Sequence, residues 1–117
     1  MVQKGDGSDI FKQVHFTAEL DNGASGAADT IDWTAGNNQK STQSEACTFT
    51  FTAPAGVCHL TLKAVNFGAF TPVWPGTVKW GADTEPSWTA AGEDIISFYF
   101  DGTSYHGAAL LDTGVPA

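Results

Sequence analysis

The chain has 117 residues, of which 42% are hydrophobic and 15% charged, and its five basic residues are outnumbered by thirteen acidic ones. This length suffices for one domain with a buried core. The net charge of −8 opposes binding to DNA or RNA, because such binding requires Lys and Arg side chains that neutralise phosphates.

The hydropathy pattern also argues against a membrane protein. No run of apolar residues reaches the roughly 18 that a membrane-spanning helix requires. The first eleven residues, MVQKGDGSDIF, lack the apolar stretch of a secretory signal peptide. We therefore expect a protein that is synthesised in a cytoplasm and has no membrane partner.

The N-terminal part of the chain divides into an arm and a first strand. Residues 1–13 are largely polar, with two glycines, which predicts an arm that becomes ordered only when it is bound. From Val14 to Leu20 apolar and polar residues alternate, as in a half-buried strand, and Asp21-Asn22-Gly23 has the composition of a turn. We expect the folded domain to cover 14–110 and a C-terminal tail to cover 111–117.

The middle of the chain predicts a β-hairpin. A short strand around Ile31 and Trp33 is followed by a polar stretch. Apolar residues then alternate with threonine or other polar residues over 47–52 and again over 58–64, with Pro-Ala-Gly between the two segments. In the register that matches the two apolar faces, Cys47 and Cys58 lie about 13 Å apart, too far for a disulfide. The pattern therefore predicts two buried, free thiols.

The last third of the chain predicts further short strands. Pro72 and Pro75 belong at sheet edges or bends, because proline cannot donate a backbone hydrogen bond. Strands are expected over 77–80 and 95–100, with Asp101-Gly102 as a two-residue turn to a return strand. In that hairpin Phe98 and Tyr105 would form a cross-strand aromatic pair.

The whole pattern predicts an all-β fold with about eight short strands and no substantial helix. Half-buried strands of this length hide their apolar faces by packing two sheets together, so we expect an antiparallel β-sandwich of jelly-roll-like type. The predicted core consists of Phe16, Trp33, Phe49, Phe51, Leu60, Leu62, Trp74, Trp80, Phe98 and Tyr105.

Catalytic and metal-binding motifs are weak. His15, His59 and His106 fall at outward strand positions or a strand end and lack metal-binding spacing. No G-x-S-x-G sequence marks a nucleophile. We therefore predict no catalytic residue, no metal and no cofactor.

Two acidic pairs leave an alternative open. Asp83 with Glu85, and Glu93 with Asp94, flank the aromatic-rich loops. They have the chemistry of calcium ligands or of an acid and base for glycoside hydrolysis. The spacing does not fix either pair, so a solvated loop is the preferred interpretation.

Three tryptophans, Trp74, Trp80 and Trp88, are the remaining functional candidates. Core packing is preferred, because tryptophan is highly buried on average. The alternative is a sugar-binding platform, which requires an exposed indole beside hydrogen-bonding groups. The predicted glycan-binding or partner-binding loop consists of Asp83, Thr84, Glu85 and Trp88.

An ordered set of segments resembles a known module. These segments are DWTAGN (32–37), TFTFTAPAG (48–56), LTLK (60–63), WPGTVKW (74–80) and DIISFYFDGTSYHG (94–107). Together they resemble a structural module of tailed bacteriophages that occurs in tail fibres, head fibres and capsid-decorating proteins. The resemblance covers about 31–107. One departure is Gly81-Ala82 after the second tryptophan, where the family often has Pro-Gly-Gly.

The resemblance implies a non-enzymatic virion protein on the particle surface, made in the host cytoplasm. It would decorate or stabilise the capsid, as a cement or head-fibre protein, and form a homotrimer. Its partners would be other copies of itself and the major capsid protein or another virion protein. The candidate docking arm contains Gln3, Lys4, Asp9, Ile10 and Phe11. The alternative is a tail-fibre or fibre-tip module that binds host-surface polysaccharide.

Overall fold

The computed structural model describes residues 18–113. Within that range the chain forms nine strands and two short 3-10 turns, which confirms the predicted all-β class. The strands are β1 (Leu20–Ala24), β2 (Ala28–Asp32), β3 (Asn38–Thr42), β4 (Cys47–Thr52), β5 (Cys58–Val65), β6 (Pro72–Val73), β7 (Val78–Trp80), β8 (Glu93–Phe100) and β9 (Tyr105–Leu110). The 3-10 turns are η1 (Phe67–Ala69) and η2 (Gly81–Asp83).

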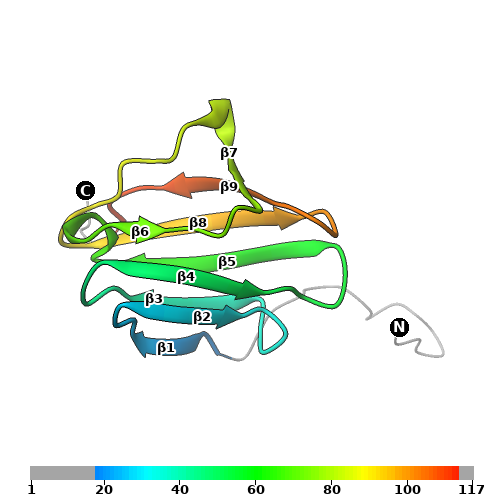
Figure 1. Ribbon diagram of the computed structural model, residues 1–117, viewed down its shortest axis with the longest axis horizontal. Helices are drawn as coiled ribbons and strands as arrows, with labels where there is room; N and C mark the ends of the chain where they lie inside the picture. The colour runs from blue at the N-terminus through cyan, green and yellow to red at the C-terminus, as the bar shows by residue number, and fades with distance from the viewer. Residues whose placement is uncertain (1–17, 114–117) are drawn as a thin grey trace, which may run out of the picture.

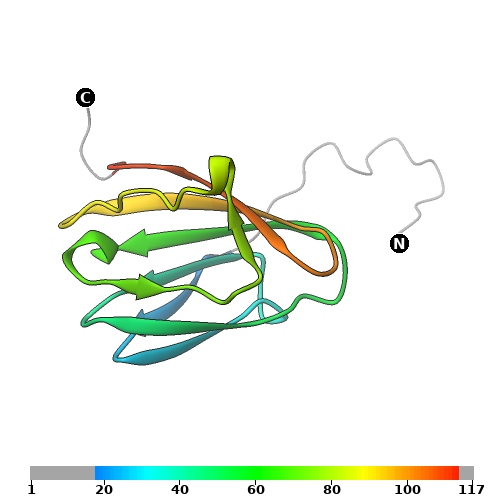
Figure 2. The same ribbon diagram turned by 45° about the horizontal axis from the view of Figure 1, so that its top comes forward.

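The strands form two sheets that pack against each other (Figure 2). The larger sheet has the order β1-β3-β5-β8-β9-β7, and the smaller one has the order β2-β4-β6 (Figure 1). The first six strands alternate between the two sheets, so each consecutive pair makes one rung. The three rungs, β1–β2, β3–β4 and β5–β6, stack on one another in a solenoid-like arrangement.

The stacking is parallel, which corrects the predicted antiparallel, jelly-roll-like sandwich. β1 pairs with β3, β3 with β5, β2 with β4 and β4 with β6, all in parallel, and β7 also lies parallel to β9. Only the pairs β5–β8 and β8–β9 are antiparallel. Each connection between successive strands crosses from one sheet to the other. The chain therefore returns to a given sheet one rung later and in the same direction, which makes neighbouring strands parallel.

The predicted hairpin of 47–52 with 58–64 is therefore wrong. β4 and β5 belong to different sheets, and the largely exposed segment 53–57 connects one sheet to the other. The alternation of apolar residues correctly gives the buried side of each strand. It does not say which strand is the neighbour, because a hairpin and a crossing between layers both bury the same side chains.

Both cysteines are free, as predicted, with Cys47 buried and Cys58 half-buried. The separation of the two thiols does not come from a hairpin register, because β4 and β5 do not pair. The thiols lie on strands of two different sheets. Cys47 packs in the hydrophobic core as a small apolar side chain.

β3 is a strand that the sequence does not predict. Its residues are polar, yet Gln39, Ser41 and the following Gln43 are buried. The Gln39 amide donates to the carbonyls of Asp32 and Gly36, each at 2.8 Å, and accepts from the Asn22 amide at 3.0 Å. Buried polar groups persist when they are hydrogen-bonded, so this side chain holds the turn between the first and second rungs.

The first strand begins later than predicted. β1 starts at Leu20 and continues through Asp21-Asn22-Gly23, which was expected to be a turn. The pairing with β3 is irregular between Asp21 and Ala24, and Gly23 has φ 72°, so the turn-like composition produces a bulge inside the strand. The predicted strand residues 14–17, including Phe16, lie outside the described residues.

The β8–β9 hairpin is confirmed, with a different register. The connection has four residues instead of two, and Phe100 lies opposite Tyr105 while Phe98 lies opposite Gly107. Asp101 Oδ1 accepts hydrogen bonds from the backbone N–H groups of Thr103 (2.9 Å) and Ser104 (2.7 Å). These two bonds stabilise the longer turn.

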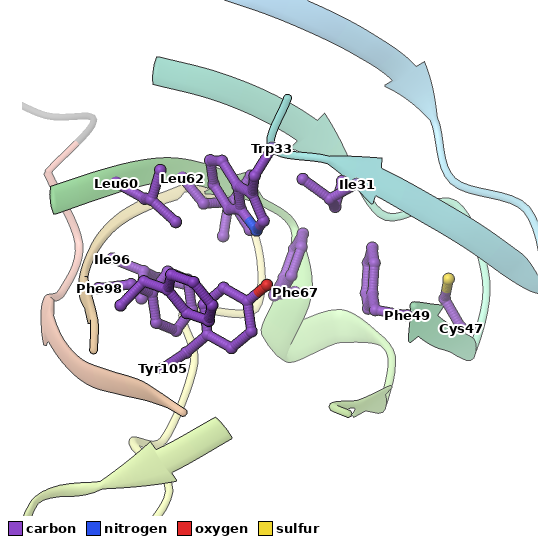
Figure 3. Close-up of a cluster of buried hydrophobic side chains, with 12 residues drawn as sticks. Ile31, Trp33, Cys47, Phe49, Leu60, Leu62, Phe67, Ile96, Phe98 and Tyr105 are labelled. Carbon is purple, nitrogen blue, oxygen red and sulfur yellow. The ribbon is translucent and has the colours of Figure 1, made fainter. Parts of the chain in front are cut away.

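The core lies between the two sheets (Figure 3). Six predicted members are buried, namely Trp33, Phe49, Leu60, Leu62, Phe98 and Tyr105. Phe51, Trp74 and Trp80 are partly buried and pack against them. The structure adds Ile31, Cys47, Ala64, Phe67, Ile96 and Phe100.

One acidic side chain of the first rung points toward the core. Asp29 is half-buried in β2, on the same side of the strand as Ile31, and its Oδ2 atom is buried without a hydrogen-bond partner. Burial raises the pKa of the Asp29 carboxyl, while the Thr30 backbone N–H and the Ser41 hydroxyl oppose this shift. The ionised carboxylate therefore destabilises the folded state.

We expect Asp29→Asn to raise the melting temperature at pH 7. A raised pKa in the folded state means that ionisation costs stability at neutral pH. This cost is absent below the unfolded pKa of about 3.9, where the carboxyl is protonated in both states. Thermal melts at pH 7 and near pH 3.5 measure the gain and its loss. Asp83→Asn, in an exposed loop, is the control, and a melting temperature that is unchanged or lower for Asp29→Asn at pH 7 would contradict the assignment.

Candidate functional site

The three candidate tryptophans form one cluster. Trp74 precedes β7, Trp80 ends β7, and Trp88 lies in the loop that leads to β8. Their ring centroids are 5.6 Å apart for Trp74–Trp80, 5.6 Å for Trp74–Trp88 and 5.5 Å for Trp80–Trp88. All three side chains are half-buried. We call Trp74, Trp80 and Trp88 the tryptophan cluster.

Glu85 connects two members of this cluster. Its Oε2 atom accepts a hydrogen bond from Trp74 Nε1 at 3.0 Å and another from Trp88 Nε1 at 2.7 Å. Hydrogen bonds to a charged acceptor are stronger than those between neutral groups. Glu85 therefore holds the 81–88 loop against the tryptophans, a role that its position in the sequence did not indicate.

The side of the tryptophan cluster that faces the interior is continuous with the hydrophobic core. Trp74 stacks on Phe49, with centroids 5.5 Å apart and planes at 19°. Trp80 lies over Gly107, where an added Cβ would come within 2.6 Å of the indole ring. The glycine at 107 thus provides the space that Trp80 occupies, and the two residues are register partners of β7 and β9.

This geometry favours a structural role for the cluster. The planes of the three indoles are inclined to one another by 54–74°, so no two of them make a common flat surface. Two of the three N–H groups are already bonded to Glu85. Of the predicted loop, only Asp83 and Thr84 present exposed side chains that are not part of this packing.

The second acidic pair has a structural role as well. Asp94 is fully buried and accepts hydrogen bonds from the Thr89 N–H (2.8 Å), the Thr89 hydroxyl (2.6 Å) and the Asp112 N–H (2.9 Å). It therefore joins the loop after the tryptophan cluster to the segment that follows β9. Across residues 18–113, no three His, Cys, Asp or Glu side chains gather at metal-binding distance.

A hollow of about 320 Å³ opens where the chain crosses between the layers. It is lined by Trp33, Thr34, Asn37 and Pro54–Cys58. The lining contains the half-buried Cys58 thiol but no carboxylate or imidazole.

The outer face of the six-stranded sheet carries a row of aromatic and basic side chains. His59 of β5, Tyr99 of β8 and His106 of β9 are exposed register partners. Their ring centroids are 5.3 Å apart for His59–Tyr99 and 6.3 Å for Tyr99–His106. This placement confirms the outward orientation predicted for His59 and His106, and His15 lies outside the described residues.

Asp101 sits at the end of this row. Its Oδ2 atom lies 2.8 Å from His106 Nε2. The backbone N–H of Ser104, the His106 side chain and the backbone N–H of Thr103 lower the pKa of Asp101 to about 2. The carboxylate is therefore ionised at neutral pH and orients the His106 ring.

The predicted docking arm, with Gln3, Lys4, Asp9, Ile10 and Phe11, lies outside the described residues. No helix of the described chain is long and apolar enough to cross a membrane. No family model, curated protein or solved structure matches this chain. The resemblance to phage structural modules therefore remains a prediction from the sequence.

We expect Glu85→Ala to loosen the tryptophan cluster. Loss of two hydrogen bonds to one carboxylate should lower the free energy of unfolding by about 1–3 kcal/mol. The indole rings should also become more accessible, which shifts tryptophan emission to longer wavelength and increases quenching by acrylamide. Ser87→Ala is the control, because Ser87 is exposed in the same loop. Equal quenching in the wild type and Glu85→Ala would rule out the role assigned to Glu85.

Proposed function

We propose that this chain is a non-enzymatic structural protein of a tailed-phage virion. It decorates or stabilises the capsid as a homo-oligomer, and the resemblance to phage structural modules implies a trimer. Its second partner is the major capsid protein or another virion protein on the particle surface. The observation that carries the proposal is the edge of the first rung, formed by β1 and β2, which no strand within residues 18–113 covers.

The two ends of the stack differ in how their strand edges are protected. At the far end the six-stranded sheet continues through antiparallel β8 and β9, and β6 is only two residues long and begins with Pro72. Short strands and prolines are features that prevent edge-to-edge pairing. At the first rung, β1 and β2 have no strand on their outer side among the described residues.

β2 is the more regular of these two edges. All five of its residues pair in register with β4, without the irregularity found in β1. Such an edge presents unpaired N–H and C=O groups to another chain. A closed, symmetric oligomer covers such edges without forming an open fibre, which supports a homo-oligomer as the functional form.

The chemistry of the described residues agrees with a non-enzymatic role. The acidic groups at the candidate sites serve the fold, since Glu85 bonds two indoles, Asp94 bonds two loops and Asp101 stabilises a turn. Catalysis by a carboxylate pair needs two groups placed on either side of a substrate. Both oxygens of Asp94 and of Asp101, and the Oε2 atom of Glu85, already accept hydrogen bonds within the protein.

The alternative function is a tail-fibre or fibre-tip module that binds host-surface polysaccharide. Such a module would need a binding surface other than the predicted loop at 83–88. The predicted loop at 83–88 is anchored by Glu85, and the indoles beside it are half-buried and mutually inclined. Polysaccharide binding through flat stacking on that cluster is therefore not favoured.

Removal of residues 1–9 tests attachment to the capsid. We expect the shortened chain to lose occupancy on purified capsids, while its melting temperature stays close to that of the full chain, because none of the described strands is removed. Occupancy is measured by co-sedimentation with capsids lacking the protein. Unchanged occupancy would contradict a docking role for the arm.

A lysine on the edge strand tests assembly through the first rung. Thr30 of β2 and Thr50 of β4 are register partners with exposed side chains, but only Thr30 lies on the edge strand. Thr30→Lys should shift the oligomer toward monomer, because a lysine on an edge strand opposes pairing. Thr50→Lys is the matched control, and both changes should alter the free energy of unfolding by only about 0.5 kcal/mol. Analytical ultracentrifugation gives the oligomeric state, and identical behaviour of the two variants would exclude this edge.

A further inference from the structure

We propose that Asn22 is a site of spontaneous deamidation, and that its conversion to aspartate or isoaspartate releases β1 from the first rung. The inference is carried by the position of the Asn22-Gly23 pair in the bulge of β1 and by the two hydrogen bonds of the Asn22 amide. It goes beyond capsid decoration and does not depend on it, because the modification is measured on the isolated protein.

The single Asn–Gly pair of the chain lies outside the regular ladder of the larger sheet. Asp21 pairs with Lys40 and Ala24 with Thr42, so Asn22 and Gly23 together lie opposite one residue of β3. The Gly23 N–H donates to Asp21 Oδ1 at 2.8 Å and not to a neighbouring strand. The peptide group between Asn22 and Gly23 is therefore not held by strand pairing.

The backbone nitrogen of Gly23 is open to the neighbouring carboxamide. Gly23 is exposed, has φ 72°, and an added Cβ would meet none of the described atoms within 4 Å. Glycine has no side chain that would shield this nitrogen from the side chain before it. The pair thus has the geometry in which a backbone nitrogen can attack an asparagine side chain.

The reaction needs only water as a co-reactant. The Gly23 nitrogen forms a bond to Asn22 Cγ and loses its proton to solvent, while the Cγ–Nδ2 bond breaks and Nδ2 takes up a proton and leaves as ammonia. The product is a cyclic succinimide. Water then adds to one of its two carbonyls and opens the ring, which yields aspartate or isoaspartate at position 22.

Two hydrogen bonds restrain the Asn22 amide in the folded protein. Its Nδ2 atom donates to Gln39 Oε1 and to the Lys40 carbonyl, each at 3.0 Å. β1 is the last strand of the larger sheet on this side, with no further strand beyond it in residues 18–113. Edge elements open locally at a lower free energy than central strands, and each opening frees the amide. The reaction is therefore slow, and opening of β1 controls its rate.

The product cannot restore these two bonds. A carboxylate at position 22 offers only acceptors, and it would face the acceptors Gln39 Oε1 and Lys40 O. Gln39 cannot compensate by turning its amide over, because its Nε2 atom already donates to the carbonyls of Asp32 and Gly36. Isoaspartate also adds one carbon to the backbone of β1. Deamidation therefore removes the side-chain link between β1 and β3 irreversibly.

Peptide mapping by mass spectrometry, after incubation of the full chain in mildly alkaline buffer, tests the modification. Asn22 should lose its amide about tenfold faster than Asn37, Asn38 and Asn66, none of which precedes glycine. Gly23→Asp should slow the loss at Asn22 about tenfold, because aspartate tolerates a positive φ while its side chain crowds the nitrogen. Equal rates at all four asparagines, or an unchanged rate in Gly23→Asp, would overturn the assignment of this site.

Hydrogen exchange tests the release of β1, with Asn22→Asp as the equivalent of the product. Backbone amides of 20–24 should exchange about tenfold faster than in the wild type, while those of β5 and β8 keep their rates. Asn66→Asp is the matched control, because it makes the same chemical change at the start of η1, where the structure of 18–113 has no side-chain capping bond. Unchanged exchange of 20–24 in Asn22→Asp, or an equal increase in Asn66→Asp, would overturn the proposed release.

Discussion

The parallel stacking of rungs is the constraint on which the rest of the structure depends. Because the chain changes sheet after each of its first six strands, each inward residue lies over an inward residue of the next rung. Ile31 thus meets Phe51 within one sheet, and Gln39 meets Leu62 within the other. A rung that shifted by one residue would turn its buried side chains to solvent. The hydrogen bonds of Gln39 to the preceding turn help to prevent such a shift.

The core must also be covered at the end of the stack of rungs, and the tryptophan cluster provides part of this cover. Beyond the third rung the six-stranded sheet continues in β8 and β9, while the three-stranded sheet stops at the short β6. The aromatic side chains between β6 and β8 cover the core where the smaller sheet is missing, with Trp74 stacked directly on Phe49. Two carboxylates, Glu85 and Asp94, fix the loops that carry these rings. The densest aromatic region of the sequence is thus explained by closure of the fold.

Closure at one end leaves two different exposed surfaces. The first rung offers backbone groups at its edge, which suits pairing with another protein chain. The outer face of the larger sheet carries the exposed row of His59, Tyr99 and His106. The two surfaces adjoin at β1, yet the aromatic row lies on the strands farthest from that edge.

The sequence by itself determined the all-β class, the alternation that buries Phe49 and Leu60, the outward positions of His59 and His106, and the β8–β9 hairpin. These features depend on local periodicity and turn composition, which a single chain segment carries. Tertiary structure alone decided that β4 and β5 lie in different sheets and that the polar segment 38–42 is a central strand. It also decided that Glu85 bonds two indoles. Each of these features depends on contacts between residues that are distant in the chain. The same local sequence pattern is compatible with other strand pairings and other side-chain contacts, so the pattern alone does not determine them.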